Sequence, residues 1–228
     1  MEFDLFLWPM LIPMIIPLIY CMKYKRDALI EIGIITLAMV LIVVLYWPLL
    51  TSNLALTYTY PAAKVLLFVL LPLILLLAKK RDTSPLHGAL YGVTKQGSKK
   101  SFFWFILFLP IMLVVSGLIQ YFYGVTWNAD PVAGAISFFE AFTEEFFFRG
   151  ILFIFLLQKT NMKIAYVTSL ASFILIHPQN LTTLFVVGTM IQGIFTLEIA
   201  RRSQNIIGSW MLHGSNRFFE LVLLPLLM

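Results

Sequence analysis

The stretch FFEAFTEEFFFRGILF, residues 138–153, places four ionisable side chains in an otherwise apolar segment. They are Glu140, Glu144, Glu145 and Arg149. A charged group near the centre of a bilayer costs at least about 2.5–3.5 kcal/mol on insertion scales, so such groups normally persist only where they have a function. The segment therefore predicts a membrane helix that carries a functional site.

Composition extends this prediction to the whole chain. Of 228 residues, 61% are hydrophobic and 12% are charged, and the mean hydropathy is +0.93, which excludes an ordinary soluble domain. We predict an all-α fold, a polytopic transmembrane helical bundle, because a helix satisfies its own backbone polar groups and needs roughly 20 apolar residues to cross lipid. About eight spans are predicted: Phe3–Met22, Ala28–Leu50, Pro61–Ala78, Ser101–Tyr121, Val132–Leu157, Ile164–His177, Leu181–Ala200 and Ile206–Leu227.

The basic residues predict how these spans are oriented. The connectors KYKRD, KKRDTSPLHGALYGVTKQGSKK, QKTNMK and RRSQN hold most of the sixteen Lys and Arg residues, and the alternate connectors hold none. Because cytoplasmic loops are enriched in Lys and Arg, this alternation predicts both termini outside. Lys64 is an exception, and we expect it to extend along the outer end of the third span towards the interface.

The same distribution bears on partners. The formal charge is +5 and the pI is about 9.3, but the basic residues lie in short loops with no aromatic–basic interleaving, so no nucleic-acid partner is expected. Membrane lipids are the expected surroundings. The chain has one cysteine, Cys21, which has no partner for an internal disulfide. We predict a single integral membrane domain over residues 1–228.

Helical spacing separates the roles of the charged residues. Side chains four apart share a helix face, whereas adjacent ones diverge by roughly 100°. Glu145 and Arg149 are therefore predicted to form an ion pair, with Glu144 pointing elsewhere and Glu140 one turn above it. The pair alone could be structural, holding one helix to another.

Two histidines add further polar groups to the later spans. The sequence SFILIHPQN places His177 at the outer end of the sixth span, with Phe173 one turn earlier. The sequence WMLHGSNRFFE places His213 in the eighth span, with Asn216 three residues on and Arg217 four residues on. Counted along their spans, Glu144 lies mid-membrane, His177 near the outer face and His213 nearer the cytoplasmic face. Meeting at one site therefore requires tilt, a displaced sixth helix or a shifted span boundary.

Water activation is the chemistry that these groups support. A carboxylate in an apolar pocket can act as a general base, and a histidine can share the water or protonate a leaving amine. A second histidine with an amide can stabilise a tetrahedral oxyanion. Alternatively, Glu144, His177 and His213 could bind zinc. The soluble metalloprotease signature HExxH is absent, so we favour a site without metal or other cofactor.

Together these residues resemble a known family. EEFFFRG has the form EExxxR, FILIH has the form FxxxH, and a third motif begins at His213. Their order and spacing are similar to those of the CPBP family, the CAAX-prenyl-protease and bacteriocin-processing-like intramembrane proteases, also called Abi proteins. The resemblance covers residues 101–228 as a catalytic core. Residues 1–100 would then hold three accessory spans and a cytoplasmic loop.

The resemblance implies a role for each site residue. Glu144 becomes the base that activates water, Glu145 and Arg149 its support, and His177 the partner that holds the water. His213 and an amide neighbour become the oxyanion stabilisers. The family usually has Asn four residues after the last histidine, but here that position is Arg217. Either Asn216 substitutes, or Arg217 donates, or the third motif is altered.

These observations predict an intramembrane endopeptidase that cuts a membrane-associated or membrane-anchored peptide or protein. A glutamic-type mechanism is favoured over a metal-dependent one, and a prokaryotic plasma membrane is the expected location. Two alternatives remain. One is a non-catalytic immunity or scaffold protein on the same fold. The other is a proton-coupled transporter, in which the Glu, His and Arg residues would form a relay.

Overall fold

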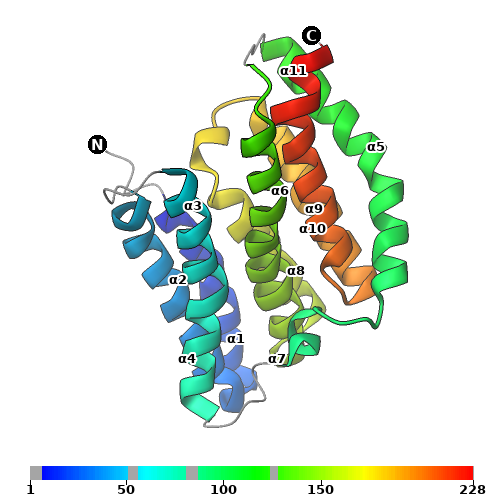
Figure 1. Ribbon diagram of the computed structural model, residues 1–228. Coiled ribbons are helices and arrows are strands. Elements are labelled where there is room, and N and C mark those ends of the chain that lie inside the picture. The colour runs from blue at the N-terminus through cyan, green and yellow to red at the C-terminus, as the bar shows by residue number, and fades with distance from the viewer. Residues whose placement is uncertain (1–6, 51–55, 81–86, 124–127, 228) are drawn as a thin grey trace.

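The computed structural model describes residues 7–50, 56–80, 87–123 and 128–227, and within these ranges its regular secondary structure is entirely helical. The helices of these ranges form eight rods, several of which combine consecutive helical elements (Figure 1). The N-terminal rods are η1 (Trp8–Met14) with α1 (Ile15–Tyr24), η2 (Arg26–Ala28) with α2 (Leu29–Leu50), and α3 (Leu56–Lys64) with π-helical η3 (Val65–Leu70) and α4 (Leu71–Lys80).

The remaining rods begin at α5. They are α5 (Ser98–Tyr123); α6 (Pro131–Glu145) with π-helical η6 (Phe146–Phe155) and α7 (Leu156–Lys159); α8 (Met162–Leu175); α9 (Phe185–Ser203); and α10 (Ile207–Phe218) with π-helical η8 (Phe219–Leu223) and α11 (Leu224–Leu227). Two short 3-10 segments, η5 (Gly88–Tyr91) and η7 (Pro178–Asn180), lie in connectors.

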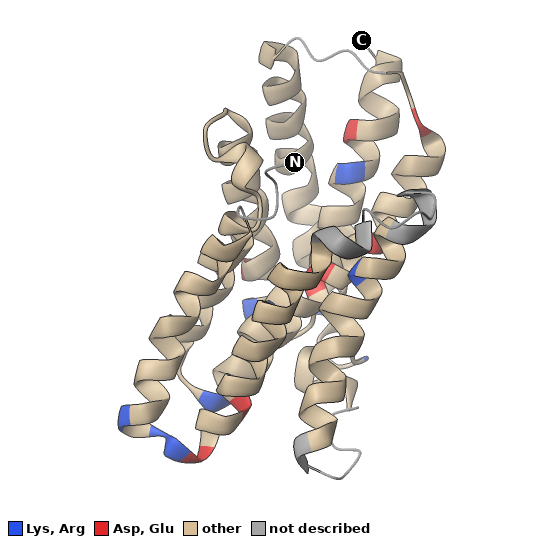
Figure 2. Ribbon diagram, turned by 90° about the vertical axis from the view of Figure 1, so that its left-hand side faces the viewer, with Lys and Arg blue, Asp and Glu red and all other residues tan. Residues whose placement is uncertain are grey.

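The all-α prediction is confirmed, and each rod overlaps one predicted apolar run. By length and composition, three described helical segments suffice to cross a membrane: Arg26–Tyr46, Tyr60–Ala78 and Ser98–Tyr123. Figure 2 shows a largely uncharged ribbon, with charged residues gathered at its lower end, a second group near mid-height and a few on the rods at the upper right. The full number of spans and the side on which the termini lie stay predictions.

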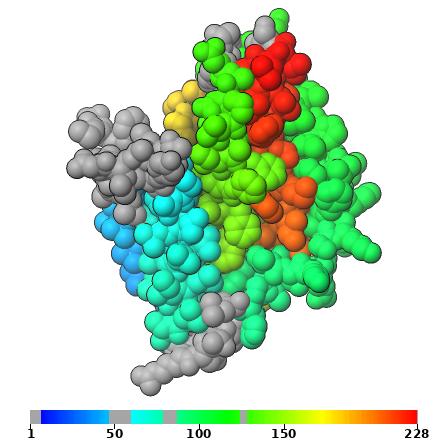
Figure 3. All heavy atoms as spheres, viewed as in Figure 1, coloured from blue at the N-terminus to red at the C-terminus, as the bar shows by residue number. Residues whose placement is uncertain are grey.

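The rod formed by α6, η6 and α7 is the centre of the molecule. Residues 143–156 are all buried, as expected for a central helix whose apolar residues lie on all sides, and the burial includes Glu144, Glu145 and Arg149. Phe68 of η3 packs edge-on against Phe147, with ring centroids 5.5 Å apart, and Phe173 of α8 packs against Phe148 at 5.4 Å. The third rod, cyan in Figure 3, lies directly beside the yellow-green central rod. The N-terminal helices therefore pack on one side of it.

Helix α10 packs closely against α6 on another side of the centre. A Cβ atom added at Gly214 would lie 2.7 Å from the backbone oxygen of Phe138. A Cβ atom at Gly134 would lie 2.3 Å from Val222. Only glycine permits this approach without a shift, because real Cβ contacts are longer. The contact brings His213, next to Gly214, towards the carboxylates of α6.

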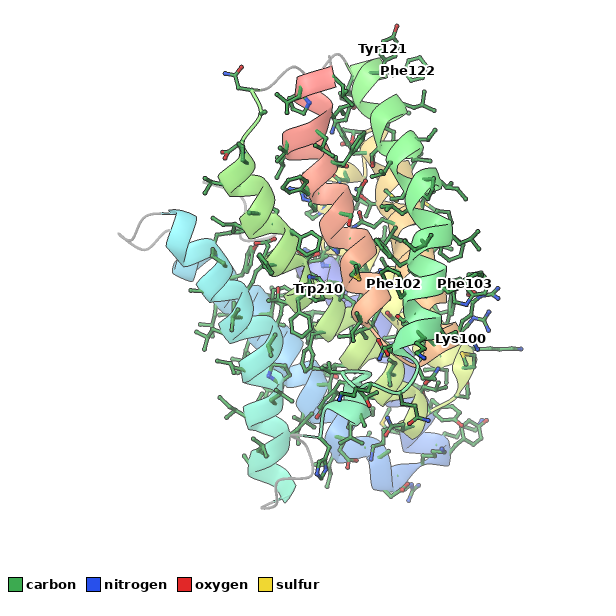
Figure 4. The ribbon with its side chains drawn as sticks, turned by 45° about the vertical axis from the view of Figure 1, so that its right-hand side comes forward. Lys100, Phe102, Phe103, Tyr121, Phe122 and Trp210 are labelled. Carbon is green, nitrogen blue, oxygen red and sulfur yellow. The ribbon has the colours of Figure 1, made fainter. Side chains whose placement is uncertain are left out.

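Helix α5 forms an outer face of the bundle. Figure 4 shows Phe102 and Phe103 near one end of α5 and Tyr121 and Phe122 near the other, all pointing away from the neighbouring helices. Eighteen residues separate Phe103 from Tyr121, about 27 Å along a helix, which is close to the thickness of the hydrocarbon layer. Aromatic residues are enriched at both membrane interfaces, so this face fits a lipid-facing span.

Candidate active site

Glu145 lies in a fully buried ion-pair cluster at the end of α6. Its Oε2 is 3.2 Å from Arg149 Nε, one helical turn away, which confirms the predicted pair. Its Oε1 is 2.9 Å from His213 Nδ1 on α10. Glu145 therefore connects the central rod to the helix that carries the third motif.

The buried guanidinium of Arg149 is held by α8 and α9. It donates hydrogen bonds to the Gly193 carbonyl oxygen at 3.2 Å and to the Thr196 hydroxyl. Its central carbon lies 4.0 Å from the ring centroid of Phe173, in a cation–π contact. Arg149 and Phe173 were predicted as supporting residues, and the two are in direct contact.

Glu144 points to a different environment, as the helical spacing predicted. Its Oε2 lies 3.9 Å from His177 Nε2 and 4.0 Å from His213 Nε2. Within the described part of the chain, this buried oxygen accepts no hydrogen bond. The fold thus brings together one carboxylate and two imidazoles from α6, the α8–α9 turn and α10.

The partners of the two rings define their hydrogen positions. His177 Nδ1 lies 2.9 Å from the Phe173 carbonyl oxygen, and a carbonyl only accepts, so Nδ1 carries the hydrogen. His213 Nδ1 faces the Glu145 carboxylate in the same way. Each neutral ring therefore presents an Nε2 lone pair towards Glu144, and each protonated ring presents an Nε2–H.

His177 lies just past the end of α8, in agreement with the helix end expected from the sequence. Helix α8 has 14 residues, so it extends only about 21 Å. His177 then begins a turn at Pro178 instead of continuing the helix. The turn that follows this short helix places His177 Nε2 3.9 Å from Glu144 Oε2, so the two side chains meet at one site.

A cavity of about 460 Å³ opens beside these groups. Glu144, His177 and His213 line it, together with uncharged polar side chains from α5, α9 and α10. The side-chain oxygen of Gln120, in α5, is buried and accepts no hydrogen bond from the described residues. The cavity also includes Gln192 of α9. The volume of the cavity lies in the range of ligand pockets. Its walls carry Glu144 and the two histidines as well as these uncharged polar side chains.

The third motif has two candidate donors, and both line this cavity. Asn216 is buried, accepts from Ser116 Oγ at 2.7 Å, and donates to Gln192 Oε1 at 3.0 Å and Glu220 Oε1 at 3.1 Å. Arg217 Nη1 pairs with Glu220 Oε2 at 3.0 Å, and 44% of its side chain is exposed. Asn216 is thus the enclosed donor and Arg217 the partly exposed one.

Lys64 is the site residue that the sequence analysis placed wrongly. Its Nζ lies 2.5 Å from Glu144 Oε1 and 2.7 Å from Glu140 Oε1, and the residue is only 4% exposed. It does not extend to an interface. The sequence did contain a signal, because a lone lysine within an apolar span is a functional candidate by default.

Glu144, His177 and His213 are not spaced as the ligands of a preformed zinc site. Ligand atoms in a tetrahedral zinc site lie about 3.3–3.5 Å apart, whereas Glu144 Oε2 is 3.9–4.0 Å from the two imidazole nitrogens. The other oxygen of Glu144 faces the Lys64 ammonium. Over the described ranges, no group of three or more His, Cys, Asp or Glu side chains is placed to hold a metal ion.

Comparison with known proteins gives the family. Residues 99–219 match the family model described as type II CAAX prenyl endopeptidase, Rce1-like, which covers more than half of the 228 residues. The chain belongs to this family. Neither the curated proteins nor the solved structures yielded a match.

Membership of the family agrees with the motifs and establishes the class of protein. Members are membrane endopeptidases, so the chain is an integral membrane protein of a protease family with a peptide or protein substrate. All three motifs, from Glu144 to Asn216, lie inside the matched range. Lys64 lies outside it.

Proposed function

We propose that this protein is an intramembrane endopeptidase of the glutamic type, in which Glu144 activates water without a metal ion. The observation that carries the proposal is the position of Glu144 Oε2. It is free of hydrogen bonds from the described residues and lies 3.9 and 4.0 Å from two imidazole nitrogens at a cavity wall. These separations suit a water held between Glu144 and one imidazole, with the second imidazole close enough to serve the same reaction.

The hydrogen positions give the first step. A water between Glu144 Oε2 and His177 Nε2 donates one hydrogen bond to each, which directs its oxygen lone pair into the cavity. As that oxygen forms a bond to the carbonyl carbon of the scissile peptide, its proton passes to Glu144. The carbonyl oxygen becomes an oxyanion.

The second imidazole, that of His213, stabilises the oxyanion. In its protonated form His213 donates from Nε2, and the Glu145 carboxylate at Nδ1 stabilises the positive charge, as a buried carboxylate does behind other catalytic histidines. Asn216 contributes an amide N–H when it exchanges a bond to Gln192 or Glu220 for the oxyanion. Collapse then breaks the C–N bond, and Glu144 returns the proton to the leaving amine.

The substrate is proposed to be a peptide or protein anchored in, or associated with, a prokaryotic plasma membrane. The cavity supports this class, because its amide and hydroxyl groups suit a peptide backbone and its helices suit lipid surroundings. Nothing among the described residues of the site suggests nucleic acid. We propose that the enzyme needs no cofactor, so dialysis against a zinc chelator should leave cleavage unchanged.

The variant Glu144→Gln tests the proposal before any substrate is identified. Membranes from cells that produce wild-type or variant protein are compared by chemical labelling of new protein N-termini and mass spectrometry. We expect a set of termini that requires the wild-type protein and disappears with Glu144→Gln, since loss of a general base costs about 10²–10⁴-fold or more. Glu198→Gln is the matched control, because Glu198 pairs with Arg201 and Arg202 away from the cavity. Identical termini with Glu144→Gln would favour the scaffold alternative.

A further inference from the structure

The N-terminal helices contribute a charged group directly to the candidate site. Lys64 is the last residue of α3, in the third rod, and lies 35 positions before the family-matched range begins at residue 99. Its ammonium contacts Glu144 Oε1 at 2.5 Å and Glu140 Oε1 at 2.7 Å. It also lies 4.7 Å from the ring centroid of Tyr60, one turn earlier. Tyr60 and Lys64 both line the cavity.

The charges explain why the contact is close. Glu140 and Glu144 lie one turn apart on α6, so they share a face and repel each other. A buried carboxylate needs a partner, because an unpaired charge in low dielectric is strongly unfavourable. One ammonium contacts an oxygen of each carboxylate, so the two acids share a single buried positive partner.

The two oxygens of Glu144 are used differently. Lys64 occupies Oε1, whereas Oε2 faces His177 and His213 and accepts no hydrogen bond from the described residues. Fixing one oxygen limits rotation of the carboxylate and keeps the other directed at the imidazoles. Glu140 also binds the ammonium, so two carboxylates of α6 hold Lys64 in place.

We infer that Lys64 is a positioning residue for the hydrolytic reaction, and that the N-terminal helices complete the active site instead of only packing against it. The inference rests on the proposed function of Glu144. Lys64 acts through Glu144, by fixing its Oε1. A simpler role, in which the ammonium only offsets part of the negative charge of two buried carboxylates, makes a different prediction.

Charge-balanced variants separate the two roles. Lys64→Met removes the ammonium and leaves Glu140 and Glu144 unpaired. The double variant Lys64→Met, Glu140→Gln keeps the same net charge as wild type, because it removes one positive and one negative group. Lys64→Arg keeps the charge in a larger side chain. Lys159→Met is the matched control, since Lys159 pairs with Glu31 at 3.3 Å between the same two parts of the chain but away from the cavity.

Two quantities are measured for each full-length variant. One is the thermal unfolding midpoint in detergent, and the other is the rate at which the wild-type-dependent N-termini appear in membranes. We expect Lys64→Met to lower both. The double variant should recover part of the midpoint lost in Lys64→Met, because only one unpaired carboxylate then remains, but its cleavage rate should stay about tenfold or more below wild type, because orientation is not restored. Lys64→Arg should recover most of the rate, and Lys159→Met should keep it.

Opposite outcomes overturn the inference in distinguishable ways. If the double variant recovers rate and stability together, Lys64 only neutralises charge. If Lys64→Met cleaves at the wild-type rate, Lys64 has no part in the reaction. If wild type and Glu144→Gln yield the same termini, the proposed function fails first and the positioning role fails with it.

Discussion

The N-terminal helices and the family-matched region use polar residues in opposite ways. In the described part of residues 7–80, the buried side chains are almost all apolar, and Lys64 and Glu31 are the charged exceptions. Residues 99–219 instead bury two ion-paired acids, an arginine, a histidine and many hydroxyls and amides. The motifs that identify the family therefore lie where polar groups are concentrated.

This difference shows that a family motif need not delimit an active site. The matched region supplies the carboxylate, both imidazoles and the amide donors. The ammonium that contacts the reactive carboxylate comes from α3, outside that region. Three variants test how strongly each part depends on its buried charges and its close packing. They are given from the largest expected effect to the smallest.

Arg149→Met should have the largest effect on folding. It removes the guanidinium partner of the fully buried Glu145, which keeps only its contact with His213, and breaking a buried ion pair in this way costs about 3–5 kcal/mol of unfolding free energy. Equilibrium unfolding in detergent measures the loss. Adding Glu145→Gln should recover part of it, because the unpaired charge is then gone. A loss below about 1 kcal/mol in Arg149→Met would mean that the matched region does not depend on its buried charges.

Gly214→Ala should have an intermediate effect, on the α6–α10 contact. The added Cβ would lie 2.7 Å from the Phe138 oxygen, and overpacking of this kind costs about 1–3 kcal/mol. Cleavage should fall as well, because His213 moves with α10. Gly33→Ala in α2 is the control, since a Cβ there meets no atom within 4 Å. Equal midpoints for the two variants would contradict the close packing of these helices.

Lys159→Met should have the smallest effect, because its contact with Glu31 is partly exposed on the lysine side. Pairs of this kind contribute about 0–1 kcal/mol. Unfolding and cleavage should both stay close to wild type. A loss of stability or cleavage comparable to that of Lys64→Met would contradict this. It would show that ion pairs in general hold the two parts of the chain together, and not the contact of Lys64 with Glu140 and Glu144 in particular.

The sequence predicted the rods well, because long apolar runs and basic connectors are local signals. It also predicted the direction of the charged side chains on α6, since helical spacing alone separates Glu144 from the Glu145–Arg149 pair. The position of Lys64 was not predictable in the same way. Its burial depends on which face of the third rod meets α6, and an apolar run carries no such information.

The position of His177 in the bundle was also only partly predictable from the sequence. The sequence placed His177 at the outer end of the short run 164–177, and α8 does end just before it, in a turn at Pro178. The proline marked the end of the helix, but it did not indicate how deep in the bundle that end lies. Depth depends on the lengths of all the packed rods together.

The most direct test of the central claim is the cleavage rate of Glu144→Gln, His177→Ala and their double variant. Each is reconstituted in liposomes with a substrate protein identified by N-terminal labelling. If both side chains act on one shared water, the double variant should be as slow as the slower single variant, within about threefold, because groups that act as a unit are strongly non-additive. A double variant whose rate falls by the product of the two single losses would contradict the account.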